Sequence, residues 1–63
     1  MKPEEVYKSV RKKYKSILPF LNERARRMWV ATEAESLGYG GQRIVHRATG
    51  ITIKTIRKGI KEL

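Results

Sequence analysis

The stretch GGQRIVHRATGITIKTIRKGI, residues 40–60, decides the expected fold because it places a glycine between two segments that show helical periodicity. In the first segment, a short helix that ends at Thr49 has one apolar side, formed by Ile44, Val45 and Ala48. Gly50 follows directly, and glycine readily adopts the positive φ that a sharp reversal of the chain requires. The stretch therefore predicts two helices joined by a tight turn.

The second of these helices is expected to be amphipathic, with cations on its outer side. It begins after Thr52, a good N-cap residue. At about 100° per residue, its apolar and cationic side chains fall into separate arcs. The apolar arc holds Ile53, Ile56, Ile60 and Leu63, and the cationic arc holds Lys54, Arg57, Lys58 and Lys61. Two helices joined by a short glycine turn, the second of them basic, are typical of a helix-turn-helix, whose second helix enters the major groove of DNA.

The overall charge indicates a polyanionic partner. The 63 residues include fifteen Lys and Arg against six acidic residues, which gives a net charge of +9. Residues 1–21 carry six cations and two acids, residues 22–40 carry three of each, and residues 41–63 carry six cations and one acid. The excess positive charge is therefore concentrated at the two ends of the chain.

The residue inventory argues against an enzyme. The chain has no cysteine and no aspartate, and its glutamates mostly lie at helical spacings beside Lys or Arg, as in ordinary surface ion pairs. We expect no catalytic site, no metal site, no cofactor and no small-molecule ligand. The longest mainly apolar run, residues 17–21, is too short to cross a membrane, and a lack of cysteine is typical of a reducing compartment. A cytoplasmic protein without a membrane partner is expected.

Two further helices are expected ahead of the opening stretch. Apolar residues three or four apart predict a helix over about residues 3–18, and Pro19 marks its end. A second helix is predicted over about residues 23–37. Asn22, a good N-cap, precedes it, and Gly38, which suits the position after a helix, follows it.

The chain is therefore predicted to be all-α, one small domain of three to four helices over residues 1–63 that contains a helix-turn-helix. The leading helix is followed by a trihelical unit over about residues 22–63. Trp29 is the bulkiest apolar side chain and, with Met28 beside it, is expected to anchor the core. The expected core consists of Met28, Trp29, Val45, Ile51, Ile56 and Ile60.

Two segments, LNERARRMWVATEAESLGYGG and IVHRATGITIKTIRKGIKEL, resemble the N-terminal region of the Rhodopirellula-type DDE transposases of bacterial insertion sequences, the ISAzo group. That family shows a similar Glu-Arg-x-Arg-Arg-apolar-Trp-x-Ala-x-Glu-Ala run, then Leu-Gly-x-Gly-Gly, a Thr-Gly turn and a Thr-Ile-x-x-Gly recognition segment. The matching positions, within about residues 20–63, are Glu23, Arg24, Arg26, Arg27, Met28, Trp29, Ala31, Glu33, Ala34, Leu37, Gly38, Gly40, Gly41, Thr49, Gly50, Thr55, Ile56 and Gly59.

The resemblance implies an amino-terminal DNA-binding domain that recognises the inverted-repeat ends of a mobile element. In that family the domain precedes an RNase H-like catalytic domain that uses carboxylates and divalent metal, which this sequence does not contain. We therefore expect a fragment of a transposase, acting in transposition and DNA recombination, that binds double-stranded DNA sequence-specifically without catalytic activity of its own.

Two positions depart from these patterns. A helix-turn-helix usually carries alanine four residues before the turn glycine, where the helices cross closely, and this chain has His46. The larger side chain either opens the crossing or rotates outward, and no partner histidine or cysteine accompanies it as a metal ligand. Ile53 stands where the family tends to be polar, and it either extends the core or contacts a thymine methyl group.

The predicted DNA contacts lie on the last two helices. Base contacts are expected from Ile53, Lys54 and Arg57, and base or phosphate contacts from Lys58 and Lys61. Contacts to the DNA backbone are expected from Gln42, Arg43, Thr52 and Thr55. The leading helix also carries a basic side, which is either a solvated surface or a phosphate contact; its residues are Lys8, Arg11, Lys12 and Lys15.

Three alternative functions fit the sequence less well. A helix-turn-helix transcription regulator would form a homodimer on a palindrome, and a homodimer through an apolar patch at Ile60 and Leu63 is left open. A membrane-surface peptide would gain helical order on anionic vesicles, but the Thr-Gly turn argues against it. RNA binding is disfavoured because no exposed aromatic side chain is expected apart from the core.

Overall fold

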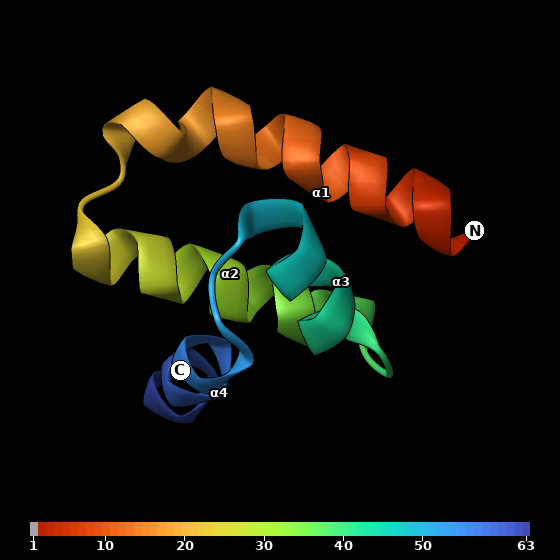
Figure 1. The fold of residues 1–63 in the computed structure, drawn as a ribbon. Helices are drawn as coiled ribbons and strands as arrows, with labels where there is room; N and C mark the ends of the chain where they lie inside the picture. Colours follow the sequence, from red (N-terminus) through yellow and green to blue (C-terminus); the bar gives the residue numbers. More distant parts are fainter. Residues whose placement is uncertain (1) are drawn as a thin grey trace.

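The computed structural model describes residues 2–63, and this part of the chain contains helices and no strand. The all-α fold class is therefore confirmed. The elements are α1 (Pro3–Ile17), a short 3-10 helix η1 (Leu18–Phe20), α2 (Glu23–Leu37), α3 (Gly41–Thr49) and α4 (Ile53–Glu62). Figure 1 shows that α1 and α2 run in opposite directions, joined through η1.

Local signals account for the helix ends. Pro3 occupies the first position of α1, and the tight turn of η1 accommodates Pro19, so the helix ends close to the predicted break. Asn22 caps α2, since its Oδ1 accepts a hydrogen bond from the backbone N–H of Ala25 at 2.8 Å. α2 ends at Leu37, and Gly38 follows it with a φ of 71°. The predicted bounds of the second helix are confirmed.

The turn between α3 and α4 also follows the prediction. Gly50 adopts a left-handed conformation with φ 78° and ψ −2°, and its N–H donates to the carbonyl of His46 at 2.8 Å. The side chain of Thr52 then caps α4, because its Oγ1 accepts a hydrogen bond from the N–H of Thr55 at 3.2 Å. Three residues therefore separate the two helices, as a helix-turn-helix requires.

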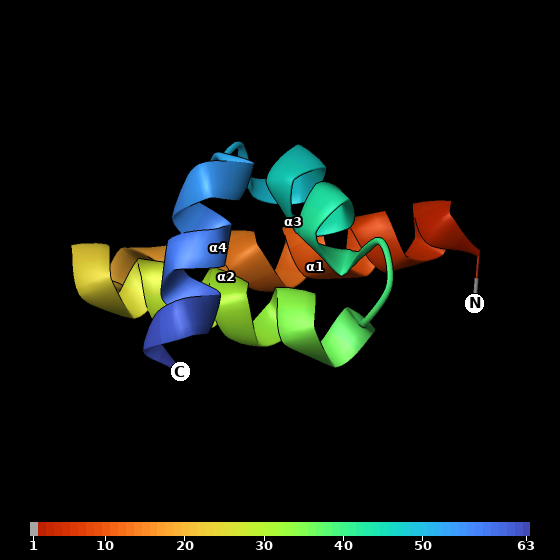
Figure 2. The ribbon, with the colours of Figure 1, turned by 90° about the horizontal axis from the view of Figure 1, so that it is seen from below.

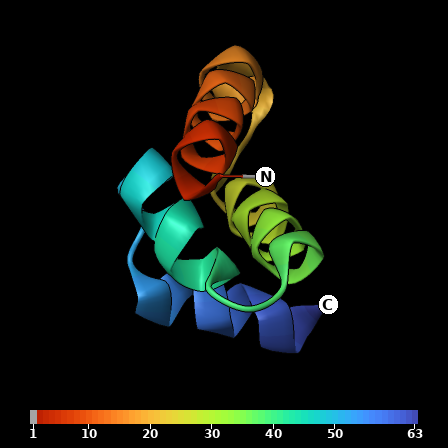
Figure 3. The same cartoon turned by 90° about the vertical axis from the view of Figure 1, so that its right-hand side faces the viewer.

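The main helix contacts are those of α1 with α3, α2 with α3, and α2 with α4. In Figure 3, α1 lies at the top and α4 at the bottom, with α2 and α3 between them. Figure 2 shows the same arrangement from below, with α4 nearest the viewer and crossing over α2. α1 and α4 therefore form opposite sides of the molecule.

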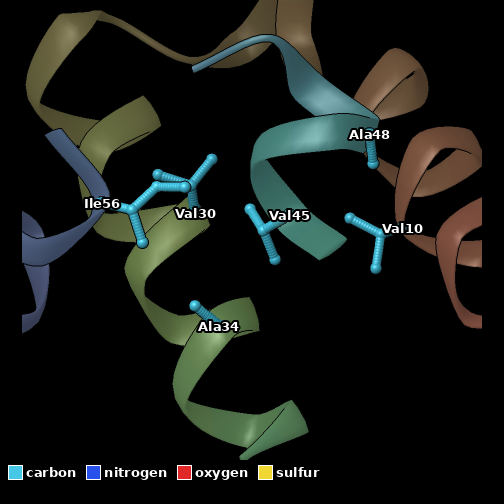
Figure 4. Packing of buried hydrophobic residues seen from close by; sticks show 6 residues of the cluster. All are labelled: Val10, Val30, Ala34, Val45, Ala48 and Ile56. Carbon is cyan, nitrogen blue, oxygen red and sulfur yellow. The ribbon is translucent and has the colours of Figure 1, made fainter. Parts of the chain in front are cut away.

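All four α-helices contribute to one core (Figure 4). The buried cluster consists of Val10 from α1, Val30 and Ala34 from α2, Val45 and Ala48 from α3, and Ile56 from α4. The predicted core positions Val45 and Ile56 are confirmed, and Ile51 and Ile60 are half-buried against the cluster. Because Val10 is only 2% exposed, α1 packs within the same core as the other helices.

The predicted core residues of α2 are confirmed only in part, because Trp29 packs against the core but the most buried side of the helix is a different one. Its buried residues are Val30, Ala31 and Ala34, on the other side of the helix from the predicted pair. Trp29 is half-buried, packs against the cluster as Ile51 and Ile60 do, and lies beside the ring of Tyr14 in α1 with a centroid separation of 5.6 Å. Met28 does not belong to the cluster. Small residues occupy the most buried side because α2 contacts both α3 and α4, and close helix approach leaves little room for side chains.

At Gly59, α4 approaches α2 closely. A Cβ atom at this position would lie 2.8 Å from the carbonyl oxygen of Arg27 and 2.9 Å from the Cβ of Ala31. Both distances are shorter than van der Waals contact, so the crossing requires a glycine in α4 and a small residue in α2. This contact decides which side of α4 faces the core and which side remains exposed.

Candidate nucleic-acid interface

The outer side of α4 carries four exposed cations. We call Lys54, Arg57, Lys58 and Lys61 the basic α4 face. Ile56 and Gly59, on the inner side of the helix, are buried. In residues 2–63 the ion pairs are Lys13 with Glu33 and Arg27 with Glu62, so no cation of this face forms an ion pair. The face is available to an external anion.

The only acid of α4, Glu62, forms its ion pair with α2 and not with a cation of the basic α4 face. Arg27 of α2 holds both carboxylate oxygens of Glu62, with N···O distances of 2.8 and 2.9 Å. The hydrogen bond from Arg27 lowers the pKa of Glu62 below its ordinary value, and the charges of Arg27 and Lys58 act in the same direction. This ion pair ties the C-terminal end of α4 to α2 and leaves the outer face purely cationic.

Gln42 and Arg57, which are fifteen positions apart, are joined by a hydrogen bond between α3 and α4. The Arg57 Nε–H donates to the Gln42 side-chain carbonyl at 3.2 Å. The two residues, both predicted DNA contacts, therefore form one hydrogen-bonded unit. The bond to Gln42 holds the Arg57 guanidinium through Nε, the nitrogen nearest the aliphatic part of the side chain. Around this unit lies a shallow pocket lined by Gly38, Tyr39, Gly40, Gln42, Arg43, Ile53 and Arg57.

Ile53 is half-buried and does not belong to the hydrophobic cluster. It lines both the shallow pocket beside Gln42 and an adjoining surface depression formed with the four cations of the basic α4 face. Of its two predicted roles, extension of the core is therefore wrong. The side chain is an apolar contact at the edge of a cationic surface. Leu63, the other end of the predicted apolar arc, is exposed.

Thr52 and Thr55 lie on a different flank of α4 from its cations. Thr52 donates its hydroxyl hydrogen to Thr55 Oγ1 at 3.0 Å, in addition to capping the helix. Both residues line a second depression, together with Arg26 and Arg27 of α2. The two threonines therefore lie apart from the hydrogen-bonded pair Gln42–Arg57. Arg43, in contrast, is exposed on α3 and lines the same pocket as that pair.

His46 is exposed, so its side chain rotates outward and does not open the helix crossing. Its Nδ1 lies 2.7 Å from the carbonyl oxygen of Ile51, which identifies Nδ1 as the protonated donor nitrogen. Thr49 reinforces the same turn by accepting the N–H of Ile51 at 3.2 Å. Residues 2–63 contain no group of three potential metal ligands, and His46 serves to fix the turn.

Tyr39 is a surface residue that the sequence reasoning missed. Its side chain is fully exposed in the loop between α2 and α3, beside the Gln42–Arg57 unit. The expectation that no exposed aromatic side chain lies apart from the core was therefore wrong. The available signal was the placement of Tyr39 between Gly38 and Gly40, because a residue in so short a glycine loop has no helical face on which to bury its ring.

Comparison of the chain with protein-family models, with curated proteins and with solved structures finds no match. The resemblance to insertion-sequence transposases therefore stays a prediction. Among residues 2–63, no helix combines the length and the apolar character needed to span a membrane.

Proposed function

We propose that this chain is a sequence-specific, double-stranded DNA-binding helix-turn-helix domain whose α4 enters the major groove. The observation that carries the proposal is the basic α4 face: four exposed cations without acidic partners on the helix that follows the glycine turn. When cations of this kind neutralise DNA phosphates, the counterions condensed on the DNA are released into solution, and this release favours binding. The Arg27–Glu62 ion pair supports it because the carboxylate is paired with α2 and forms no ion pair with a cation of this surface.

Arg57 is the proposed base-reading residue. Because Gln42 accepts a hydrogen bond from its Nε, the two terminal nitrogens of the guanidinium remain free to donate to guanine O6 and N7. Ile53, beside it, offers an apolar surface to a thymine methyl group. Lys54 is a further base contact, whereas Lys58 and Lys61 contact bases or phosphates farther along the helix. Arg43, on the neighbouring helix, contacts the DNA backbone.

The finer proposal rests on the resemblance. The domain would recognise the inverted-repeat ends of an insertion sequence as the N-terminal part of a DDE transposase. In that role the catalytic domain of the parent protein would cut and join the DNA, while this domain would select the DNA sequence at which this happens. A transcription regulator would share the same α4 surface and would differ by binding a palindrome as a dimer.

Single-stranded nucleic acid is a second candidate ligand because Tyr39 is fully exposed beside two arginines, Arg43 and Arg57. Bases stack on exposed aromatic rings, and neighbouring cations hold the backbone. A duplex and a single strand of the same sequence, compared as competitors, separate the two ligands. We expect the duplex to compete more strongly.

The decisive experiment measures binding of fluorescent duplexes, one selected from a random library and one random, across a salt series. We expect affinity to fall steeply with salt and to be at least about tenfold higher for the selected duplex.

Arg57→Ala should cost about 1–3 kcal/mol of binding free energy on the selected duplex and relax the preference at one base pair. Arg24→Ala, at an exposed arginine of α2, is the matched control and should change affinity much less. Equal losses for Arg57→Ala on both duplexes would show that Arg57 contacts only phosphate.

A further inference from the structure

A second cationic surface lies on α1. We call Lys8, Arg11, Lys12 and Lys15 the basic α1 face; all four side chains are exposed. The remaining lysine within α1, Lys13, lies toward α2 and forms an ion pair with Glu33. No residue of the basic α1 face has an acidic partner within residues 2–63. Positive charge without a partner is thus present on α1 as well as on α4.

The basic α1 face is extended by a groove toward α3. Arg11 and Lys15 line this groove together with Arg47 of α3. The guanidinium of Arg47 lies 4.7 Å from the centre of the Tyr7 ring, a cation–π contact that fixes its position beside α1. Three cations from two helices therefore border one depression. Such an arrangement suits the closely spaced phosphates of a nucleic-acid backbone.

The spacing of these cations is unfavourable for the free domain. Lys8 and Lys12 are four residues apart on one helix, as are Arg11 and Lys15, and like charges at this spacing destabilise a helix. The acids of α1 are confined to its first turn. A polyanion bound along α1 would relieve this repulsion.

The two basic faces point in opposite directions. Val10 directs the inner side of α1 into the core, and Ile56 does the same for α4, so the cations of each helix face outward. Figures 1 and 3 show α1 and α4 on opposite sides of the molecule, with α2 and α3 between them. The Cα extents of the whole domain are only 29 × 24 × 16 Å.

One duplex cannot contact both faces. DNA has a persistence length of about 50 nm, so bending it around a domain of 29 × 24 × 16 Å is strongly unfavourable. A duplex bound to the basic α4 face therefore leaves the basic α1 face free. A second polyanion is needed to occupy it.

We propose that the basic α1 face binds a second DNA segment, so that one domain holds two duplexes together. This inference rests on the proposed function, because it takes the basic α4 face as the site of the first duplex. The contact on α1 is made to phosphates and carries no sequence preference. On α4 a hydrogen bond to Gln42 orients Arg57 for base contact, and no cation of the basic α1 face has a comparable hydrogen bond within residues 2–63. The groove bordered by Arg11, Lys15 and Arg47 is its centre.

The test is a capture assay with the purified chain. A biotinylated duplex of the selected sequence is fixed to beads, and retention of a second, fluorescent duplex of random sequence is measured as protein is added. We expect the wild-type chain to retain the second duplex. The quadruple variant Lys8→Gln, Arg11→Gln, Lys12→Gln, Lys15→Gln should reduce retention at least about tenfold while its affinity for a single selected duplex changes less than about threefold. At physiological ionic strength the Debye length is about 8 Å, so charges on the far side of the domain are largely screened.

Matched variants separate this inference from the proposed function. A second quadruple variant removes the same charge from α4: Lys54→Gln, Arg57→Gln, Lys58→Gln and Lys61→Gln, combined in one chain. It should lose the preference for the selected duplex over the random one and keep only the sequence-independent binding by α1. If that variant binds normally, the proposed function fails. A smaller pair controls for net charge: Lys8→Gln with Lys12→Gln should lower retention, whereas Lys2→Gln with Arg24→Gln, both exposed and outside the two faces, should not.

Retention of the second duplex by the quadruple α1 variant at the wild-type level would overturn the inference. In that case sedimentation would show whether two copies of the chain, paired with each other, hold the duplexes. Preferential retention of single-stranded RNA over the second duplex by the wild-type chain, lost in the α1 variant, would also overturn it. Circular dichroism and Trp29 fluorescence check that each variant is folded.

Discussion

At the scale of single residues, Gly59 shows that packing overrides helix propensity. Alanine is about 1 kcal/mol better than glycine inside a helix, so propensity alone predicts that Gly59→Ala stabilises the domain. The structure predicts the opposite, because the new Cβ would lie 2.8 Å from the Arg27 carbonyl and 2.9 Å from the Ala31 Cβ. Overpacking of this kind costs about 1–3 kcal/mol, or roughly 4–8 °C in Tm per kcal/mol for a small domain.

Thermal unfolding followed by circular dichroism measures the effect of Gly59→Ala. Lys61→Ala, on the exposed side of the same helix, is the control and should stay within about 0.5 kcal/mol of the wild type. An increase in Tm on Gly59→Ala would mean that α2 and α4 do not approach each other closely, and the direction assigned to the basic α4 face would then be in doubt.

At the scale of helices, the sequence predicted where elements begin and end better than which side they bury. Asn22, Gly50 and Thr52 act through local backbone hydrogen bonds or a local φ preference, and these can be recognised without tertiary information. The most buried side of α2 depends on the packing of three neighbouring helices, so the sequence predicted the core contact of Trp29 but not that Val30 and Ala34 are the fully buried residues. The Gln42–Arg57 hydrogen bond joins two helices, and no local rule predicts it.

The ion pair between α2 and α4 should make stability depend on pH. The pKa of Glu62 in the folded chain is lowered from its ordinary value of 4.5. A lowered folded pKa stabilises the fold above the unfolded pKa, and that contribution is lost as the pH falls through the folded value. We therefore expect the wild type to be more stable than Glu62→Gln at pH 7, and the difference to shrink as the pH drops below about 4.5.

Urea unfolding of both proteins between pH 7 and pH 3 gives this difference directly. Glu35→Gln, at an exposed carboxylate outside the ion pairs of the described residues, should unfold like the wild type throughout. A difference between wild type and Glu62→Gln that stays constant down to pH 3 would contradict the assignment of the ion pair as the link that orients α4.

At the scale of the whole molecule, the positive charge that we propose binds DNA opposes folding. A net charge of +9 on 63 residues repels itself, and the two like-charge pairs on α1, Lys8 with Lys12 and Arg11 with Lys15, alone cost about 0.4–1 kcal/mol. Raising NaCl from 50 to 500 mM should therefore increase the Tm of the free chain by several degrees, at roughly 4–8 °C per kcal/mol. The same change should weaken DNA binding, because it reduces the gain from counterion release.

The quadruple α1 variant removes four positive charges from the net charge of +9, so it should have a higher Tm at low salt, and its Tm should change less as NaCl is raised. A wild-type Tm that stays constant or falls as NaCl is raised would show that charge repulsion within the two basic faces does not destabilise the fold. It would also remove the energetic reason for expecting a bound polyanion on α1.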